Sequence, residues 1–452
     1  MGTSFGHKLG WGSLALVAVA LASAPARAEV SAETAFIFNT FSFLVSGFLV
    51  MWMAAGFAML EAGLVRTKNT ATICLKNISL YSVAGIMYYL IGYNLMYIDV
   101  GSYIGSFSFL YNTSDAELAL LNAEEATPEL IAAVVDNGYS VMSDWFFQMV
   151  FVATAASIVS GTLAERIKFW PFMIFTVILT GFLYPIQGSW TWGGGWLAEM
   201  GFSDFAGSTI VHSVGGWAAL VGAIILGPRK GKFGPNGAVH PMPGANLPLA
   251  TLGTLILWLG WFGFNGGSQL ALGSALDAAA IAIVYVNTNL AACAGVVTAM
   301  ILTQILYKKI DLTMALNGAI AGLVSITAGP DLQNHFMALI VGGIGGALVV
   351  FAIPLFDKIK VDDVVGAVSA HLVAGVWGTL AVAIFGGGSF VTQIIGIVAV
   401  GAFVIVTSAI VWLVMKYTIG LRVDEEAEEM GLDKAELGME AYPEFGHGSQ
   451  SI

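Results

Sequence analysis

Apolar segments of about 20 residues recur along this 452-residue chain, and they constrain its fold more than any other feature. A helix of that length crosses the hydrocarbon core of a lipid bilayer. Hydrophobic residues make up 57% of the chain and charged residues only 10%, which excludes an ordinary soluble core. The sequence therefore predicts an all-α polytopic membrane protein.

Eleven membrane-spanning segments are expected, each of them apolar and bounded by more polar stretches. The 55 glycines favour closely packed helices or backbone that lines a pore. The expected ranges of the segments are 35–63, 73–98, 142–163, 170–189, 205–227, 248–268, 278–306, 314–330, 335–356, 365–386 and 391–418.

The first 28 residues match the pattern of a secretory signal peptide. Lys8 supplies positive charge, residues 14–22 an apolar core, and residues 26–28 a small-x-small cleavage site. An uncleaved first span is the alternative, which the shortness of the apolar run disfavours. Cleavage would leave a membrane domain at 29–419, an acidic regulatory tail at 420–452, and the mature N-terminus outside.

Lysine and arginine residues set the orientation, because cytoplasmic loops carry an excess of both. With eleven spans, all 15 lysines and arginines after residue 28 fall on the cytoplasmic side, together with the C-terminus. Lys76, near the inner end of the second segment, is expected to snorkel to the surface. The outer loop 99–141 contains acidic residues and no basic ones, and no function is assigned to it. The signal peptide and the tail together indicate the inner (plasma) membrane of a Gram-negative bacterium.

The net charge of −12 belongs to the loops and the tail, and it argues against nucleic acid as a partner. The two cysteines, Cys74 and Cys293, both lie in apolar segments. They are expected to be buried small side chains and not a disulfide. No part of the sequence predicts a cofactor.

Two histidines, His212 and His371, lie in the middle of the fifth and tenth apolar segments. Both belong to the pattern Gly-x4-His-x-Val-x-Gly, which begins at Gly207 and again at Gly366. Segments one to five begin outside and segments six to ten begin inside, which defines a five-plus-five inverted repeat with an eleventh helix left over. The matched histidines indicate one site at a central pore, built by both repeats.

The histidine pair has a definite chemistry. A neutral imidazole has one donor and one acceptor nitrogen, so two facing rings share a proton. Together they form a row of hydrogen-bonding groups along an otherwise apolar pore. The alternative, two separate core histidines bonded to neighbouring helices, is disfavoured by the matched pattern. A metal site is disfavoured because neither histidine has a carboxylate or cysteine close by in the sequence.

Five motifs follow one another along the chain: Gly161-Thr-Leu-Ala-Glu165-Arg166, Trp192-Gly-Gly-Gly195, Asp204-Phe-Ala-Gly207, Trp261-Phe-Gly-Phe264-Asn265 and Gly420-Leu-Arg422-Val423. Together with the two histidines, they resemble the Amt/Mep/Rh ammonium transporters, and the bacterial Amt branch most closely. The resemblance extends over residues 35–442. It implies a transporter of ammonium that contains no cofactor.

The resemblance implies an outer vestibule that recruits the ammonium cation at Phe147, Trp192 and Ser268, close to Asp204. Aromatic faces attract a cation that is losing water, and a serine hydroxyl accepts a hydrogen bond from it. Interfacial anchoring is the alternative for Trp192, because tryptophan collects at membrane surfaces. Asp204 is expected to cap the following helix and to bias the local charge without touching the substrate.

Below the vestibule, the resemblance implies a gate of stacked Phe151 and Phe264, followed by a pore lined by His212, His371 and Trp261. Ordinary helix packing is the alternative for both phenylalanines. Ammonium would lose its proton above or at the gate. Ammonia would then pass the histidines, accompanied by a proton.

The resemblance also implies a homotrimer, and a tail that helps a trimeric PII-type nitrogen signal protein to bind. The tail departs from the family pattern at Leu437, where many relatives carry histidine or serine, and Gly366 replaces an aspartate of some relatives. Two alternatives stay open: an ammonium sensor or transceptor that signals through such a partner, and a passive channel for ammonia or carbon dioxide. An enzyme is not expected, because the chain has no His-Glu-x-x-His motif.

Overall fold

The computed structural model describes residues 30–445, so the expected signal peptide at 1–28 lies outside the described residues. Within 30–445 the chain forms helices and two isolated bridges, and no strand. This result confirms the all-α fold class. The predicted segments correspond in order to helices, which local apolarity alone was sufficient to locate.

Ten helical segments of the described chain have the length and apolarity of a membrane span. Four of them contain a π-helical turn and carry more than one label. The ten are α2 (Ala32–Leu64), η1–α3–η2–α4 (Thr67–Tyr97), α7 (Val141–Thr162), α8–η3–α9 (Phe169–Ser189), η4–α11 (Ser208–Leu226), α12 (Leu247–Gly267), α13 (Ala275–Tyr307), α15 (His335–Lys358), η6–α16 (Val368–Phe385) and α17 (Phe390–Thr418).

The predicted segment 314–330 corresponds to a shorter apolar helix, α14 (Leu312–Ile326). Asp311 caps this helix, accepting from the backbone N–H groups of Thr313 and Met314. The helix packs against both α13 and α15, which also pack against each other. The figure of eleven spans therefore stays a prediction, with ten long helices and this shorter one in the described part.

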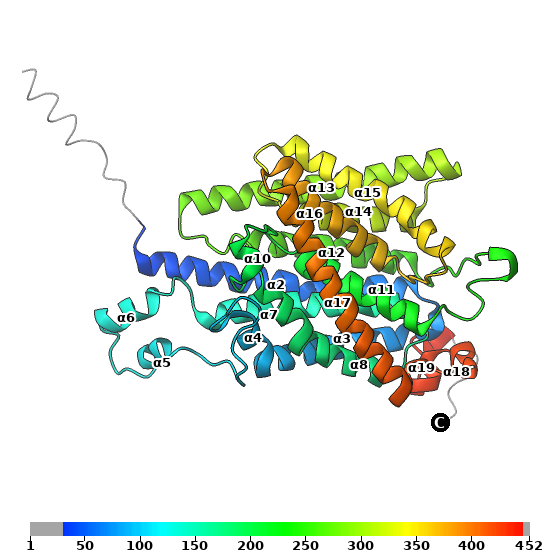
Figure 1. Cartoon of the computed structure of the whole chain (residues 1–452), viewed down its shortest axis with the longest axis horizontal. Helices are drawn as coiled ribbons and strands as arrows, with labels where there is room; N and C mark the ends of the chain where they lie inside the picture. Colours follow the sequence, from blue (N-terminus) through cyan, green and yellow to red (C-terminus); the bar gives the residue numbers. More distant parts are fainter. Residues whose placement is uncertain (1–29, 446–452) are drawn as a thin grey trace, which may run out of the picture.

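The long helices run side by side, and the short ones gather at the two ends of the bundle (Figure 1). One end, called the loop end here, carries α5 (Asp115–Leu121), α6 (Pro128–Val135) and α10 (Trp196–Glu199). The opposite end, called the tail end, carries α18 (Glu425–Met430) and α19 (Leu432–Leu437).

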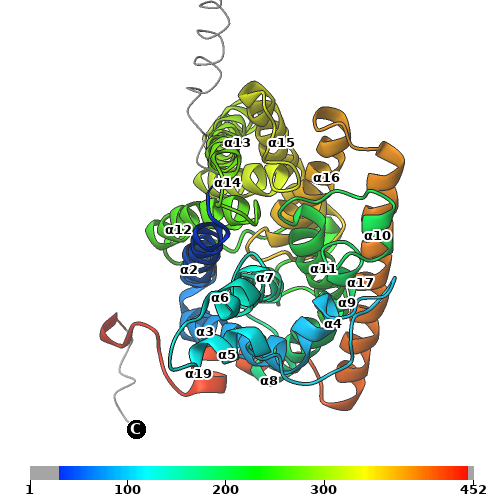
Figure 2. The same ribbon diagram turned by 90° about the vertical axis from the view of Figure 1, so that its left-hand side faces the viewer.

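Seen from the loop end, α7 and α11 lie inside the bundle (Figure 2). The helices α13, α14 and α15 pack together on one side, α2 packs along α12, and α17 covers α11 at the edge. The helix α7 is the most deeply buried span, because it packs against α2, α3 and α11. Residues on α7 and α11 are therefore placed to line an internal site.

The outer loop 99–141 folds into α5 and α6 with local signals of its own. Ser114 caps α5 by accepting from Glu117 N, and Thr127 caps α6, which begins with Pro128. Ser140 N donates to the Thr40 hydroxyl at 2.9 Å, which fastens the end of the loop to α2.

One side chain, that of Lys76, lies where the sequence did not place it. Lys76 does not snorkel, because it is only 2% exposed and its Nζ donates to the Ser160 carbonyl at 2.9 Å. The Ser160 hydroxyl donates to Glu61 Oε2 at 2.8 Å, so a carboxylate from α2 lies beside this ammonium group. That carboxylate is distant in sequence, and the pairing required the tertiary structure.

The cysteines are not buried as expected, because Cys74 is exposed on the outside of the bundle and Cys293 is half-buried. Both are free thiols, which confirms the expectation that they form no disulfide. Their apolar neighbours in the sequence belong to the surface that a bilayer covers, so apolarity did not indicate burial within the protein.

Candidate functional site

The two histidines lie on π-helical turns, His212 on η4 (Ser208–Ser213) and His371 on η6 (Val368–Val373). A glycine with positive φ precedes each turn, Gly207 at 107° and Gly366 at 81°. Only glycine adopts such angles without strain, which explains the first position of the shared pattern. π-helical turns of this kind are frequent at functional sites, where they re-aim side chains.

The last glycine of the shared pattern also has a physical reason. A Cβ atom on Gly216 would lie 2.6 Å from Leu372 Cβ, and one on Gly375 would lie 2.5 Å from the Ser208 carbonyl oxygen. Each histidine-bearing segment therefore passes directly against a glycine of the other segment. This close approach brings the two imidazoles together from opposite halves of the chain.

His212 Nδ1 lies 3.2 Å from His371 Nδ1, and the ring centroids are 5.2 Å apart. Both side chains are buried. A contact between two Nδ1 atoms requires one ring to donate and the other to accept, so the free Nε2 atoms are one acceptor and one donor. His212 Nε2 is buried without a hydrogen-bond partner among the described residues. The pair thus offers polar positions to a small guest.

The predicted gate residues lie directly above this pair. Phe151 and Phe264 are stacked, with centroids 4.0 Å apart and planes at 30°. Phe264 is 5.2 Å from His212, and Phe147 is 4.8 Å from Phe151. Phe147, Phe151, Phe264, His212 and His371 therefore form one series of neighbouring rings.

Trp261 stacks on His212 at 5.0 Å with an interplanar angle of 18°. Its indole Nε1 donates to the Thr327 hydroxyl at 2.8 Å, which satisfies a fully buried donor. Thr327 comes from the end of α14, so helices from two parts of the chain fix the orientation of this ring. Trp261 forms a rigid wall beside the histidine.

A cavity of about 420 Å³ opens at the loop end of the ring series. Phe147, Trp192 and Ser268, the three predicted recruitment residues, all line it. Trp192 Nε1 donates to the Asp204 carbonyl at 2.9 Å, and the Ser268 hydroxyl donates to the Phe264 carbonyl at 2.8 Å. The serine oxygen consequently keeps its lone pairs for a donor within the cavity.

Sequence reasoning missed other residues of this cavity, among them Asp144, Gln148 and Tyr93. Asp144 and Gln148 come from the same helix as Phe147. Asp144 precedes Phe147 by three residues and Gln148 by four, and this spacing gave a weak signal that Asp144 shares a face with each of them. Tyr93 comes from α4, and nothing in the sequence connected it with α7.

Asp204 is buried and does not line the cavity. Its carboxylate accepts four backbone N–H bonds of 2.8 to 3.0 Å, from Gly207, Ser208, Thr209 and Ile210. Burial raises the pKa of Asp204 above its usual range, and the four bonds oppose this change only in part. Asp204 thus caps the turn that carries His212.

A second cavity, of about 440 Å³, opens at the tail end and is lined by Asp363 and Gly366 among others. Asp363 accepts from the Thr162 hydroxyl at 2.9 Å and from Ser369 N at 3.2 Å. Burial raises the pKa of Asp363 to about 6. Asp363 was missed in the sequence, although it precedes its histidine at the same interval as Asp204.

The motif Glu165-Arg166 holds the tail end together and lies away from the histidines. Glu165 pairs with Arg66 and also with Arg229 at 3.0 Å, and Arg229 pairs with Asp362 at 2.9 Å. Burial alone would raise the pKa of Asp362, but Arg166 and Arg229 outweigh it and hold that pKa well below its usual range. This network joins four inter-helix loops.

The tail forms two short helices, α18 and α19, separated by Gly431 with φ 104°. Asp433 caps α3, accepting from Ala71 N at 2.9 Å and Thr72 N at 2.7 Å. Lys68 Nζ donates to the Glu428 carbonyl at 2.6 Å. The tail therefore packs on the loops of its own chain.

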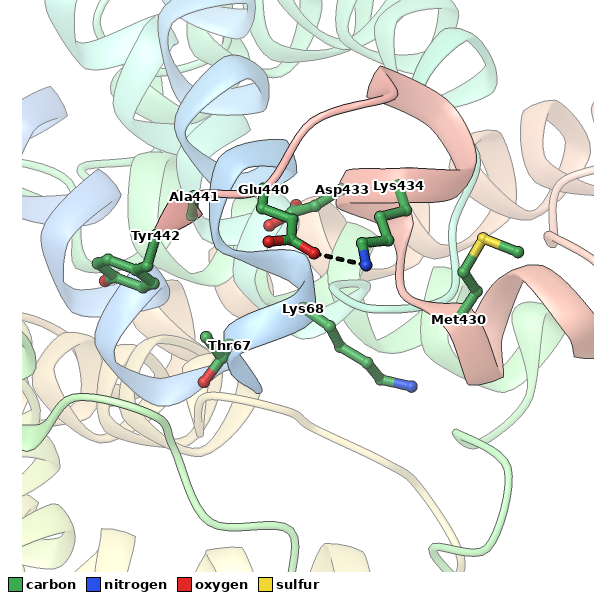
Figure 3. A pocket seen from close by; sticks show the side chains of 8 residues that line it. All are labelled: Thr67, Lys68, Met430, Asp433, Lys434, Glu440, Ala441 and Tyr442. Atoms are coloured by element: carbon green, nitrogen blue, oxygen red, sulfur yellow. Dashed lines mark ion pairs between the residues drawn. The ribbon is translucent and has the colours of Figure 1, made fainter. Parts of the chain in front are cut away.

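Between the tail and the start of α3 lies a pocket of about 220 Å³ (Figure 3). Lys68, Met430 and Tyr442 line it, and Lys434 pairs with Glu440 at 2.5 Å beside it. No group of three or more His, Cys, Asp or Glu residues in the chain from 30 to 445 is arranged to hold a metal ion.

The chain is similar to known proteins over nearly all of its described length. The model of the Ammonium Transporter Family matches residues 41–442. The ammonium transporter Amt2 of Archaeoglobus fulgidus is 39% identical over 433 residues, which cover 89% of this chain and 87% of that protein. A putative ammonium transporter of Synechocystis is 39% identical over 434 residues, with 94% of each chain covered.

Among solved structures, a sensor Amt protein superposes on this chain with a TM-score of 0.80 at 35% identity. The superposition covers 89% of this chain and 98% of that one. The sequence relatives and this structure therefore agree on the same multi-span membrane fold.

Proposed function

This chain belongs to the ammonium transporter family, and we propose that it moves ammonium inward by binding the cation, removing one proton and passing ammonia along the histidine pair. The observation that carries the proposal is the contact between the Nδ1 atoms of His212 and His371, with His212 Nε2 left unpaired. Ammonia donates and accepts hydrogen bonds, and this pair offers one position of each kind.

Recruitment takes place in the loop-end cavity. Phe147 and Trp192 present ring faces, which attract a cation, and the Ser268 oxygen accepts an N–H bond. Ring faces and one hydroxyl replace part of the water around ammonium. The cavity consequently holds the ion just above the stacked phenylalanines.

Ammonium loses its proton because the charged ion would have to give up its hydration to pass between the two phenylalanines. Phe151 and Phe264 are in van der Waals stacking and offer no hydrogen-bond acceptor to a charged guest. A bare cation between them would lose the free energy of its hydration, whereas neutral ammonia loses far less. Potassium has no proton to give up, so this step excludes it although its size is similar.

The proton follows through the histidines. Because the two Nδ1 atoms share one hydrogen, a proton added at one Nε2 is matched by release from the other Nε2. Ammonia and the proton then recombine in the tail-end cavity, which Asp363 lines. Transport moves one net charge in this scheme.

The orientation and the partners belong to the same proposal. The tail end holds Arg66, Arg166 and Arg229, which supports a cytoplasmic position in a bacterial inner membrane. A homotrimer and a PII-type protein at the tail are the proposed partners. The tail is anchored to the loops through Asp433 and Lys68, so it is placed to relay such binding.

The test is the current that an ammonium pulse evokes in proteoliposomes containing the purified protein, with potassium as the control ion. A current with ammonium alone supports the proposal. Internal alkalinisation without current would show a passive ammonia channel in its place. Silence in both measurements would favour a sensor that transports little.

A further inference from the structure

The loop-end cavity contains a carboxylate that the recruitment scheme does not use. Asp144 is the single carboxylate among the described residues that line it, and none of those residues is lysine, arginine or histidine. The side chain is only 6% exposed. A nearly buried negative charge therefore faces a cavity whose protein lining supplies no positive charge.

The partners of Asp144 are neutral. Tyr93 donates to Oδ2 at 2.5 Å, and Gln148 Nε2 donates to Oδ1 at 3.3 Å. Asp144 forms no ion pair with any residue between 30 and 445. A buried carboxylate without a cation is costly, and a cation arriving from outside removes that cost. Each oxygen also keeps a lone pair for one more donor.

Tyrosine rings surround this carboxylate. Tyr93 lies 4.1 Å from Tyr111 and 5.1 Å from Tyr97, measured between ring centroids. All three line the cavity, and the buried Tyr97 hydroxyl has no hydrogen-bond partner in the described chain. Aromatic faces around one carboxylate form the chemical environment that suits a small cation with N–H donors.

We propose that Asp144, with Tyr93 and Tyr111, forms an outer subsite for ammonium or a small alkylammonium cation. The subsite holds the cation before it reaches Phe147 and Trp192 on the way to the gate. It also gives the outer loop a role, because that loop supplies Tyr111. The inference rests on the proposed transport function and adds a step of cation capture to it.

The test is the ammonium concentration that gives half of the maximal current in proteoliposomes. Asp144→Asn removes the charge and keeps an acceptor for Tyr93, so this concentration rises about tenfold, equivalent to about 1.4 kcal/mol. The maximal current stays within about twofold, because the gate and the histidines are unchanged. Asp144→Glu, which keeps the charge, restores most of the affinity.

Two control variants distinguish a role of Asp144 in cation binding from a role in maintaining the fold. Asp115→Asn changes the same charge on exposed α5, and it leaves the half-saturating concentration unchanged. Tyr93→Phe keeps the Asp144 charge and removes its tyrosine donor, so the half-saturating concentration changes less than in Asp144→Asn. Equal loss of maximal current in Asp144→Asn and Tyr93→Phe would mean a structural role and would overturn the subsite.

The outcomes also distinguish failure of the Asp144 subsite from failure of the proposed transport function. No current in the unchanged protein overturns the proposed function, whereas an unaltered half-saturating concentration in Asp144→Asn overturns only the subsite. If Asp144→Asn does not fold, Tyr111→Ala carries the test, because it removes a ring from the outer loop. A rise of about threefold or more then supports the subsite, and no rise contradicts it.

Discussion

Asp204 and Asp363 occupy equivalent positions, each accepting a backbone N–H bond at the start of the turn that carries a histidine of the central pair. The intervals to His212 and His371 are the same in the sequence. The two carboxylates differ in their surroundings, since Asp204 is sealed by four N–H bonds and Asp363 lines a cavity. In both halves of the chain an aspartate therefore caps the turn that carries the histidine, but only Asp363 faces a cavity.

Asp363→Asn should change how stability depends on pH. The pKa of Asp363 is raised to about 6. Between about pH 4 and pH 6 the folded protein therefore keeps this proton, whereas the unfolded chain has lost it. Neutral Asp363 contributes about 3 kcal/mol to the free energy of unfolding below about pH 4. This contribution is lost as the pH rises to about 6.

Melting temperatures in detergent between pH 4 and pH 7 measure this effect. The unchanged protein loses more stability over that interval than Asp363→Asn does. Asp362 is the charged neighbour of Asp363, and its own pKa is well below its usual range, so it stays ionised throughout the interval. Parallel curves for the two proteins would contradict the raised pKa of Asp363.

His212→Leu should abolish the ammonium current. Leucine has a similar volume but offers neither donor nor acceptor to the guest, and it leaves His371 Nδ1 without its partner at 3.2 Å. The same current in proteoliposomes measures the effect. His240→Leu, on an exposed loop, is the matched control and keeps the full current. A full current in His212→Leu would refute conduction along the histidine pair.

Gly216→Ala should separate the two histidines. The added Cβ would lie 2.6 Å from Leu372 Cβ and 2.9 Å from Leu372 N, so the backbone next to His371 has to move. A displacement of about 1 Å at such a site lowers the rate by about 100-fold. Gly85→Ala is the control, because its Cβ meets only Met149 side-chain atoms at 3.8 Å. Equal currents in both variants would show that the close approach is not required.

Asp433→Ala should loosen the tail from the membrane domain. It removes the cap of α3 and leaves the N–H groups of Ala71 and Thr72 unpaired, at a cost of about 2 kcal/mol. Trypsin cleavage after Lys434 then becomes faster, which gel electrophoresis of the folded protein measures. Glu426→Ala changes an exposed carboxylate on α18 and leaves the rate unaltered. Unaltered cleavage in Asp433→Ala would contradict the anchoring role.

The sequence by itself determined the helical fold, the order of the spans and the pairing of the histidines. Hydropathy and short motifs are local properties, so Gly207 and Gly366 with their histidines are visible without coordinates. The sequence also led to Phe151, Phe264 and Trp261, although only through resemblance.

Only the tertiary structure decided which residues from different helices meet. The sequence gives no sign that Tyr93 of α4 bonds Asp144 of α7, or that Glu61 of α2 lies beside Lys76 of α3. Both contacts depend on helix packing, which places a side chain by rotation and depth as well as by its position in the chain. A buried charge in a bilayer protein therefore becomes interpretable only when its partner, or the cavity it faces, is known.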